Sequence, residues 1–512
     1  MKKKYNSKTS SAILIALTTI LFLLSSCTEQ ETKLKIVDTI LEDTSSYFYT
    51  DLTPYKNKNA KLPIGIFDSG TGGLTVFDAI VNFDKYNNNN HSSAQGGDSL
   101  RDFNEECFIY LADQANMPYG NYGAHNKDLL LKEHVLKDVQ FLLDKKYYQS
   151  QNDLNYKTDK LPIKVLVIAC NTATAYAKDD IEDFVKKANL DLKVIGVIGA
   201  GVRASLENIN IDENVSVAVM ATAGTVSSNG YVNEINKQLK SRNNSGTVSV
   251  FQQAGIGLAG AIDEATEFID KSATSPRNNY KGPSDLDEML NINKNLLSRY
   301  NFDWTNNNML YEGTKDNPKN IQINSIDNYI SYHVTTLLEQ IRKNKNSAKL
   351  KSIILGCTHY PFYTEVFETK IEQLRNYKEN ERYIYKEILA DQIDFIDPAL
   401  FTAKELYQYL TLENLFAKNN INESEFFISV PNLTNNKIVM DDNGNFNYDY
   451  KYGRNENEIQ EYVKRVPFSK NNIPLTVVER LSEKIPFTFS LIKNFNANNS
   501  KIANLKAEEK IN

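Results

Sequence analysis

Two stretches with the same layout decide the fold of this chain: VLVIACNT at Val165–Thr172 and IILGCTH at Ile353–His359. In each, a run of apolar residues ends in a small residue, which is followed by a cysteine and then by hydroxyl, amide or imidazole side chains. Short apolar runs bounded in this way are typical of buried parallel strands. Because open α/β sheets bind ligands at the carboxyl ends of their strands, Cys170 and Cys357 are predicted to lie at two such ends.

Strand and helix patterns alternate along most of the chain. Strands are predicted at 64–67, 108–112, 165–169, 194–198, 215–220 and 352–355, and helices at 74–83, 126–143, 172–188 and 326–342. This alternation predicts an α/β protein with parallel sheets covered by helices. Polar, Asn-rich stretches at 86–99, 145–160, 271–320 and 435–461 lack apolar periodicity and are predicted to be surface loops or short decorations.

The start of the chain has the features of an export signal. Four lysines, at positions 2, 3, 4 and 8, precede an apolar run at 12–24, which is shorter than the roughly 20 residues that a spanning helix needs. The ending Leu24-Ser25-Ser26-Cys27 resembles the bacterial lipoprotein cleavage box, which implies a lipid on Cys27. An ordinary signal peptide with a chance cysteine is the alternative.

We therefore expect a lipoprotein signal peptide at 1–26 and a polar tether at 27–60. The mature protein is expected to be exported and anchored to a bacterial membrane, on the periplasmic or surface face of the outer membrane.

Composition excludes several classes of protein. A chain of 512 residues can form two or three domains, and a net charge of −6 without a basic cluster argues against nucleic acid as a partner. Four cysteines are too few for a disulfide framework in an exported protein of this size. Cys107 is interpreted as a small apolar filler. No cluster with metal-ligand spacing occurs, so no metal is expected.

Five motifs occur in an order that resembles the aspartate/glutamate racemase family, and glutamate racemase in particular. They are Gly65–Gly70, Pro118–Gly120, Ala169–Ala173, Thr222–Tyr231 and Leu355–Pro361. The resemblance covers roughly 61–430. It implies two pseudo-symmetric α/β domains with the active site in the cleft between them. The first domain is expected at 61–197 plus 398–512, with a last strand around Phe426–Ser429, and the second at 198–397 with an insertion near 271–320.

Two thiols on opposite faces of an amino acid can racemise it. The Cα proton is a very weak acid, so one base must remove it from one face while an acid returns a proton to the other. A polarised site lowers the pKa of a thiol from about 8.5, so one cysteine can act as thiolate and the other as thiol. With the resemblance, Cys170 and Cys357 are the predicted catalytic pair of a cofactor-independent racemase that interconverts L- and D-glutamate.

Other residues receive roles from their motif positions. Asp68 is expected to tune Cys170 or to bind the substrate amine, and His359 to tune Cys357. The predicted substrate-binding set is Asp68, Ser69, Tyr119, Gly120, Asn171, Thr172, Thr358 and His359, with Thr225 as a further candidate. Asp113 matches an acidic position of the family. A small amino acid and a membrane are the expected partners, and a homodimer is left open.

The chain departs from the family in two ways. The segment Gln252–Leu258 lacks the usual Cys-Pro start, and either Asp263 or Glu264 could supply the acidic group that normally follows. Glutamate racemase makes D-glutamate for cell-wall precursors in the cytoplasm, whereas export is predicted here. Two alternatives therefore stay open: a racemase of aspartate or another small acid, and a non-catalytic binding lipoprotein. Each cysteine alone could also be a buried filler.

Overall fold

A computed structural model describes residues 34–94 and 96–512. The predicted signal peptide, Cys27 and the first residues of the predicted tether lie outside the described residues. Within the described part of the chain, no helix has both the length and the apolar character to cross a membrane.

The first sheet has six strands in the order β14-β13-β2-β1-β3-β4. All neighbours pair in parallel except β14, which is antiparallel to β13. The strands β1, β2, β3 and β14 are buried at every position, as expected for strands covered on both faces. Their bounds are β1 (Ile64–Asp68), β2 (Phe108–Ala112), β3 (Val165–Ile168), β4 (Lys193–Gly196), β13 (Glu425–Pro431) and β14 (Val463–Pro467).

The second sheet has four parallel strands in the order β12-β9-β5-β6. They are β5 (Val215–Ala221), β6 (Val248–Ala254), β9 (Leu350–Gly356) and β12 (Leu389–Ile396). Two antiparallel hairpins lie apart from it, formed by β7 (Met309–Thr314) with β8 (Asn317–Ile323) and by β10 (Lys378–Glu379) with β11 (Arg382–Tyr383). The predicted class, an α/β protein with two parallel sheets, is confirmed.

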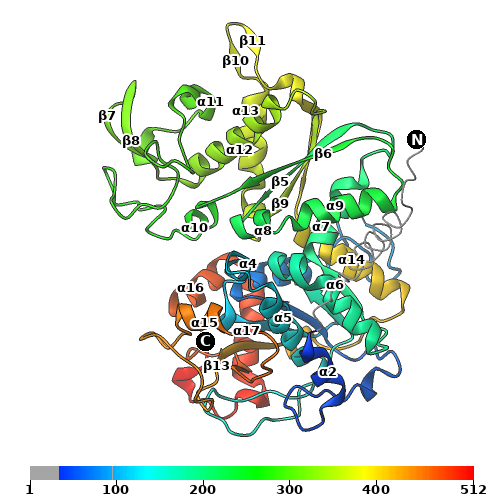
Figure 1. Cartoon of the computed structure of the whole chain (residues 1–512). Coiled ribbons are helices and arrows are strands. Elements are labelled where there is room, and N and C mark those ends of the chain that lie inside the picture. The colour runs from blue at the N-terminus through cyan, green and yellow to red at the C-terminus, as the bar shows by residue number, and fades with distance from the viewer. Residues whose placement is uncertain (1–33, 95) are drawn as a thin grey trace, which may run out of the picture.

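Helices cover both sheets, which lie in separate lobes (Figure 1). In the first lobe they are α2 (Lys35–Glu42), α3 (Leu74–Val81), α4 (Gly120–Ala124), α5 (Asp128–Leu143), α6 (Asn171–Lys187), α15 (Tyr448–Gly453), α16 (Leu475–Lys484) and α17 (Pro486–Asn498). In the second they are α8 (Ala223–Ser227), α9 (Gly230–Ser241), α10 (Leu258–Ile262), α11 (Leu297–Tyr300), α12 (Ile326–Lys343) and α13 (Thr364–Arg375). Helices α7 (Val197–Glu207) and α14 (Pro398–Leu412) pack against each other and against both sheets.

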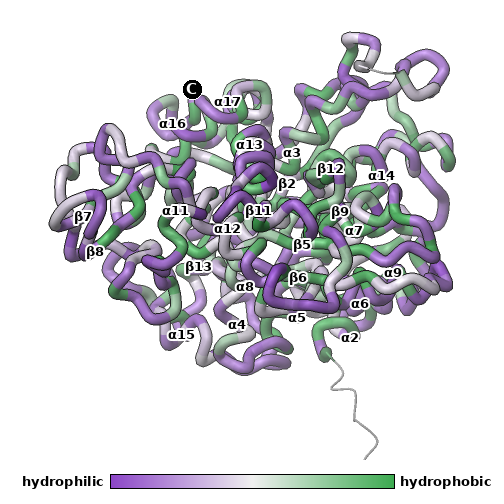
Figure 2. Tube along the Cα trace, turned by 90° about the horizontal axis from the view of Figure 1, so that it is seen from above, coloured by the Kyte–Doolittle hydropathy of each residue, from purple (hydrophilic) through white to green (hydrophobic). Residues whose placement is uncertain are grey.

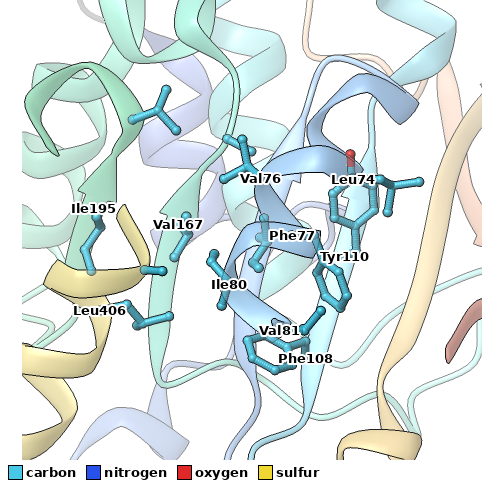
Figure 3. Close-up of a cluster of buried hydrophobic side chains, with 14 of the residues drawn as sticks. Leu74, Val76, Phe77, Ile80, Val81, Phe108, Tyr110, Val167, Ile195 and Leu406 are labelled. Carbon is cyan, nitrogen blue, oxygen red and sulfur yellow. The ribbon is translucent and has the colours of Figure 1, made fainter. Parts of the chain in front are cut away.

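The core of the first lobe forms around α3. Figure 3 shows its apolar side chains, including Phe77 and Ile80, against Tyr110 of β2, Val167 of β3 and Leu406 of α14. All five side chains are fully buried. Truncating a buried Phe to Ala typically costs about 3–5 kcal/mol, so this cluster contributes substantially to holding α3, and the loop before it, in place. In Figure 2 the hydrophobic segments follow the central strands, while the hairpin β7–β8 is largely hydrophilic.

The structure differs from the sequence prediction at the amino-terminal end. From Leu34 onward the predicted tether is folded, because α2 buries Ile36 and Ile40 at helical spacing and packs against α5. The backbone N–H of Lys35 also donates to Asn457 at 2.8 Å. Residues 34–60 therefore belong to the folded lobe.

Three further predictions differ from the structure. The stretch 271–320, predicted as loop, contains α11 and the hairpin β7–β8, and it buries Ile292, Tyr300 and Phe302 in the core of the second lobe. The predicted last strand is β13, but β14 follows it and adds an antiparallel edge. The predicted end of the fourth strand, Ile198, lies in α7 instead.

Candidate active site

The carboxyl ends of β1, β2 and β3 bring three predicted residues to one edge of the first sheet. Asp68 is the last residue of β1, Asp113 follows β2, and Cys170 follows β3 after one residue. The backbone N–H of Asp113 donates to the carbonyl of Asp68 at 2.8 Å, and that of Ala169 donates to Phe67 at 2.9 Å. The parallel register therefore places Asp68 beside the Cys170 loop.

The Asp68 carboxylate is held by the glycine turn that follows it. One of its oxygens accepts hydrogen bonds from the backbone N–H groups of Gly70, at 3.1 Å, and Gly73, at 2.9 Å. A Cβ on Gly73 would lie 2.4 Å from the Cβ of Asp68, so only glycine allows this close approach. Burial raises the pKa of Asp68, and hydrogen bonds from Gly73, Gly70 and Cys170 oppose that rise.

Cys170 is a buried N-cap residue of α6. Its Sγ accepts from the backbone N–H of Ala173 at 3.4 Å and lies 3.7 Å from the Oγ of Ser69. Burial, together with the nearby Asp68 carboxylate, raises the pKa of the Cys170 thiol to about 12. In the free protein this side chain is therefore a thiol and can donate a proton.

Cys357 has the opposite kind of neighbour. It follows β9, and its Sγ lies 3.6 Å from Nδ1 of His359, whose Nε2 lies 3.3 Å from Oδ1 of Asp263. Burial alone would lower the pKa of His359, but the hydrogen bonds to Asp263 and Cys357 outweigh it and raise that pKa to about 10. At neutral pH a cation therefore stands beside Cys357.

The structure distinguishes the two acidic candidates after Gln252–Leu258. Asp263, the C-cap residue of α10, contacts His359 and also Arg480, whose Nη1 lies 3.0 Å from the same oxygen. Burial alone would raise the pKa of Asp263, but the contacts with His359 and Arg480 outweigh burial, and the pKa lies below its usual value. Glu264 pairs instead with Lys271 at 2.6 Å, and its side chain is 58% exposed.

The two strand ends face a shared cavity, which we call the Cys357 cavity. Its volume is about 180 Å³. Thr75 and Asn171 line it from the first lobe, and Cys357 and Thr358 line it from the second. Cys170 directly precedes Asn171, whose side-chain oxygen accepts a hydrogen bond from the hydroxyl of Tyr231 at 2.9 Å. This bond joins the Cys170 loop to α9 of the other lobe.

A second space, the His359 cavity, adjoins the first. It measures about 460 Å³ and shares Thr75 and Phe362 with the Cys357 cavity. His359 and Asp263 line it, and α16 contributes Arg480 and Lys484. The carboxyl-terminal part of the chain thus forms one wall beside the predicted site.

Not every predicted residue faces these spaces. Tyr119 is 1% exposed, and its hydroxyl oxygen lies 2.6 Å from Oδ2 of buried Asp113 and 2.8 Å from Oδ2 of buried Asp138, so that it is hydrogen-bonded in the interior. A substrate contact from this residue would have to come from its backbone. Gly120 lies against Gly224 of the other lobe. Thr225 is buried, and its hydroxyl accepts from Thr222 at 3.0 Å.

The sequence prediction missed three residues near the cavities. Tyr231 ended a recognised motif but received no role, although it contacts Asn171. Asp397 lines the Cys357 cavity, and burial raises its pKa to about 6. Arg480 lies beyond the region of family resemblance, where no motif marks it. Within the part of the chain that the structure describes, no group of three or more His, Cys, Asp or Glu side chains could hold a metal ion.

Comparisons with known proteins find similarity to glutamate racemases. No protein-family model matches the chain. A glutamate racemase of Oceanobacillus iheyensis is 33% identical over 174 residues, which is 34% of this chain and 46% of that protein. A glutamate racemase of Campylobacter jejuni is 29% identical over 218 residues, covering 42% of this chain and 69% of that protein. The aligned part therefore spans about half of the first relative.

A longer alignment joins both lobes. A glutamate racemase of Fusobacterium nucleatum is 25% identical over 352 residues, which is 69% of this chain and 82% of that protein. A solved glutamate racemase from Bacillus anthracis is 21% identical, with 72% of this chain and 89% of that chain covered and a TM-score of 0.40. The chain is a distant homologue of glutamate racemases, which are isomerases.

Proposed function

We propose that this protein is a cofactor-independent amino-acid racemase that interconverts L- and D-glutamate through Cys170 and Cys357. One observation carries the proposal: the loops of the two cysteines meet at one cavity, with Asn171 on one side and Cys357 on the other. A binding protein needs no pair of thiols in this arrangement. The distant homology to glutamate racemases supports the choice of substrate.

The surroundings of the two thiols give each a starting role. We propose that Cys357, whose Sγ lies 3.6 Å from Nδ1 of His359, acts as the thiolate that removes the Cα proton; the electron pair stays on Cα and is delocalised into the substrate carboxylate. The thiol of Cys170 gives its proton to the opposite face of Cα. The step leaves Cys357 as the thiol and Cys170 as the thiolate, which is the starting state for the reverse direction.

Hydrogen exchange tests this function directly. The protein from Thr28 onward is incubated in D₂O under reducing conditions with L- or D-glutamate, without cofactor, and loss of the Cα–H signal is followed by NMR. We expect exchange with inversion, abolished in C170S and C357S. C107S is the matched control, because Cys107 is also buried and free but lies at the start of β2, away from the strand ends.

The outcomes separate the alternatives. Exchange with aspartate but not glutamate would keep the two-thiol chemistry and change the substrate. A folded, reduced protein that exchanges no amino acid would refute the racemase proposal. Equal loss of activity in C107S would show that the cysteine variants act through stability rather than chemistry.

We also propose that the protein is exported and carries a lipid on Cys27. Only the sequence supports this proposal, through the apolar run at 12–24 and the cysteine that ends it. Metabolic labelling with a radioactive fatty acid should mark the wild-type protein and not C27S. Label in C27S, or none in either protein, would refute the anchor.

A further inference from the structure

Arg480 reaches the predicted site from outside the region that resembles the racemase family. It lies on α16, which follows β14 in the first lobe, and its Nη1 lies 3.0 Å from Oδ1 of Asp263 in the second lobe. That oxygen is also the one that faces Nε2 of His359 at 3.3 Å. The chain of contacts therefore runs from Arg480 through Asp263 and His359 to Cys357.

We propose that Arg480 is a positioning residue that holds the Asp263 carboxylate against His359 and thereby keeps Cys357 reactive. The inference rests on the proposed function for its importance, although the contacts themselves do not depend on turnover. Arg480 does not line the Cys357 cavity, so it acts through the other two side chains rather than on the substrate.

The need for such a residue follows from the exposure of Asp263. Its side chain is 26% exposed and sits at the end of α10, a helix of five residues. A carboxylate in this position can turn into water, and its distance of 3.3 Å to His359 is long for a charge-assisted bond. A second partner on the same oxygen restricts that rotation.

Stability alone does not account for the pair. Arg480 is 33% exposed, and ion pairs of this exposure contribute little to folding stability. The effect of Arg480 is therefore expected in the protonation of His359, which has few partners other than Asp263. The charged or titratable groups around His359 are Asp263, Cys357 and Arg480, with Glu264, Tyr363, Glu483 and Lys484 lining the same cavity.

Removing Arg480 should weaken the contact between Asp263 and His359. In R480Q the Asp263 carboxylate turns towards water, and His359 loses the anion that keeps it protonated against burial. Without that cation, the Sγ of Cys357 loses the charged neighbour that lies 3.6 Å away. We expect its alkylation rate at pH 7.5 to fall by about 10-fold, because thiol reactivity depends on a neighbouring cation.

The test measures the reaction of each cysteine with iodoacetamide across pH, resolved by mass spectrometry, in the full folded chain. Cys170 and Cys107 serve as internal references within each sample. K484Q is the matched control, since it removes the same charge from the same helix and the same cavity but makes no contact with Asp263. R480K retains the charge and should restore most of the reactivity of Cys357.

The expected result is a selective loss at Cys357 in R480Q, little change in K484Q and recovery in R480K. The inference is overturned if Cys357 in R480Q reacts within about twofold of the wild-type rate, or if Cys170 slows equally, which would indicate a general change of the cleft. Because alkylation needs no turnover, a wild-type protein without racemase activity would refute the proposed function and still leave this measurement decisive.

Discussion

Replacing Asp263 by Asn should cost His359 its proton at neutral pH. The change keeps the shape of the side chain and removes its charge. In the wild-type protein the pKa of His359 is raised from 6.5 to about 10, against the effect of burial, by Asp263 and Cys357. At about 1.4 kcal/mol per pH unit, this difference corresponds to about 5 kcal/mol in favour of the protonated form. Without Asp263, only Cys357 opposes the effect of burial, so the pKa of His359 should fall.

The sign of the linked stability follows from this difference. A histidine whose folded pKa exceeds the unfolded value stabilises the folded state fully below pH 6.5, and that contribution disappears as the pH rises to about 10. It is at most about 5 kcal/mol, because part of it is coupled to Cys357. D263N should therefore lower the free energy of unfolding at pH 6 and have little effect above pH 10.

NMR titration of histidine labelled with ¹³C at Cε1 measures the pKa directly. The chain has five histidines, and H359Q assigns the relevant signal. His333 is the internal control, because burial lowers its pKa to about 4 and it bonds to the carbonyl of Ile256 rather than to a carboxylate. A wild-type His359 that titrates near 6.5, or one that D263N leaves unchanged, would refute this account of the site.

Three further changes test other parts of the structure. G73A should displace Asp68, whose Cβ would lie 2.4 Å from the new methyl, and lower the thermal stability by about 1–3 kcal/mol; an unchanged melting temperature would contradict this packing. R465L should cost about 3–5 kcal/mol in urea unfolding, because it leaves buried Asp138 without its partner at 2.9 Å; the double variant with D138L should lose less than the sum of the two. Y231F removes the hydroxyl that donates to Asn171 and should lower kcat/KM by about fivefold, the equivalent of one hydrogen bond of about 1 kcal/mol; unaltered kinetics would show that this bond between the lobes is dispensable.

The sequence allowed the strand ends to be predicted because their physical signal is local. The runs before Cys170 and Cys357 are continuous stretches of apolar residues, and such runs are buried between helices wherever they occur in an α/β fold. Strand β3 was therefore predicted to within one residue, at 165–169 against Val165–Ile168. Asp68 likewise ends a short apolar strand, so its place beside Cys170 follows from the parallel register.

Other parts of the site depend on contacts between distant segments, which leave no local pattern. Arg480 lies on an ordinary amphipathic helix, and nothing near it in the sequence indicates that it reaches Asp263. Tyr119 shows the converse: its motif position indicated a substrate contact, but its hydroxyl is bound by two carboxylates in the interior. A motif predicts where the backbone goes more reliably than where a particular side chain points.

The two cysteine loops look alike in sequence, yet their surroundings differ in charge. Burial, together with nearby Asp68, raises the pKa of Cys170 to about 12, whereas protonated His359 stands beside Cys357. Two cysteines with the same neighbours would offer no distinction between the group that removes a proton and the group that returns one. Here the neighbours differ, and the proposed reaction uses Cys170 as the acid and Cys357 as the base in one direction. The asymmetry between the lobes, more than their likeness, is what suits this pair of side chains to racemisation.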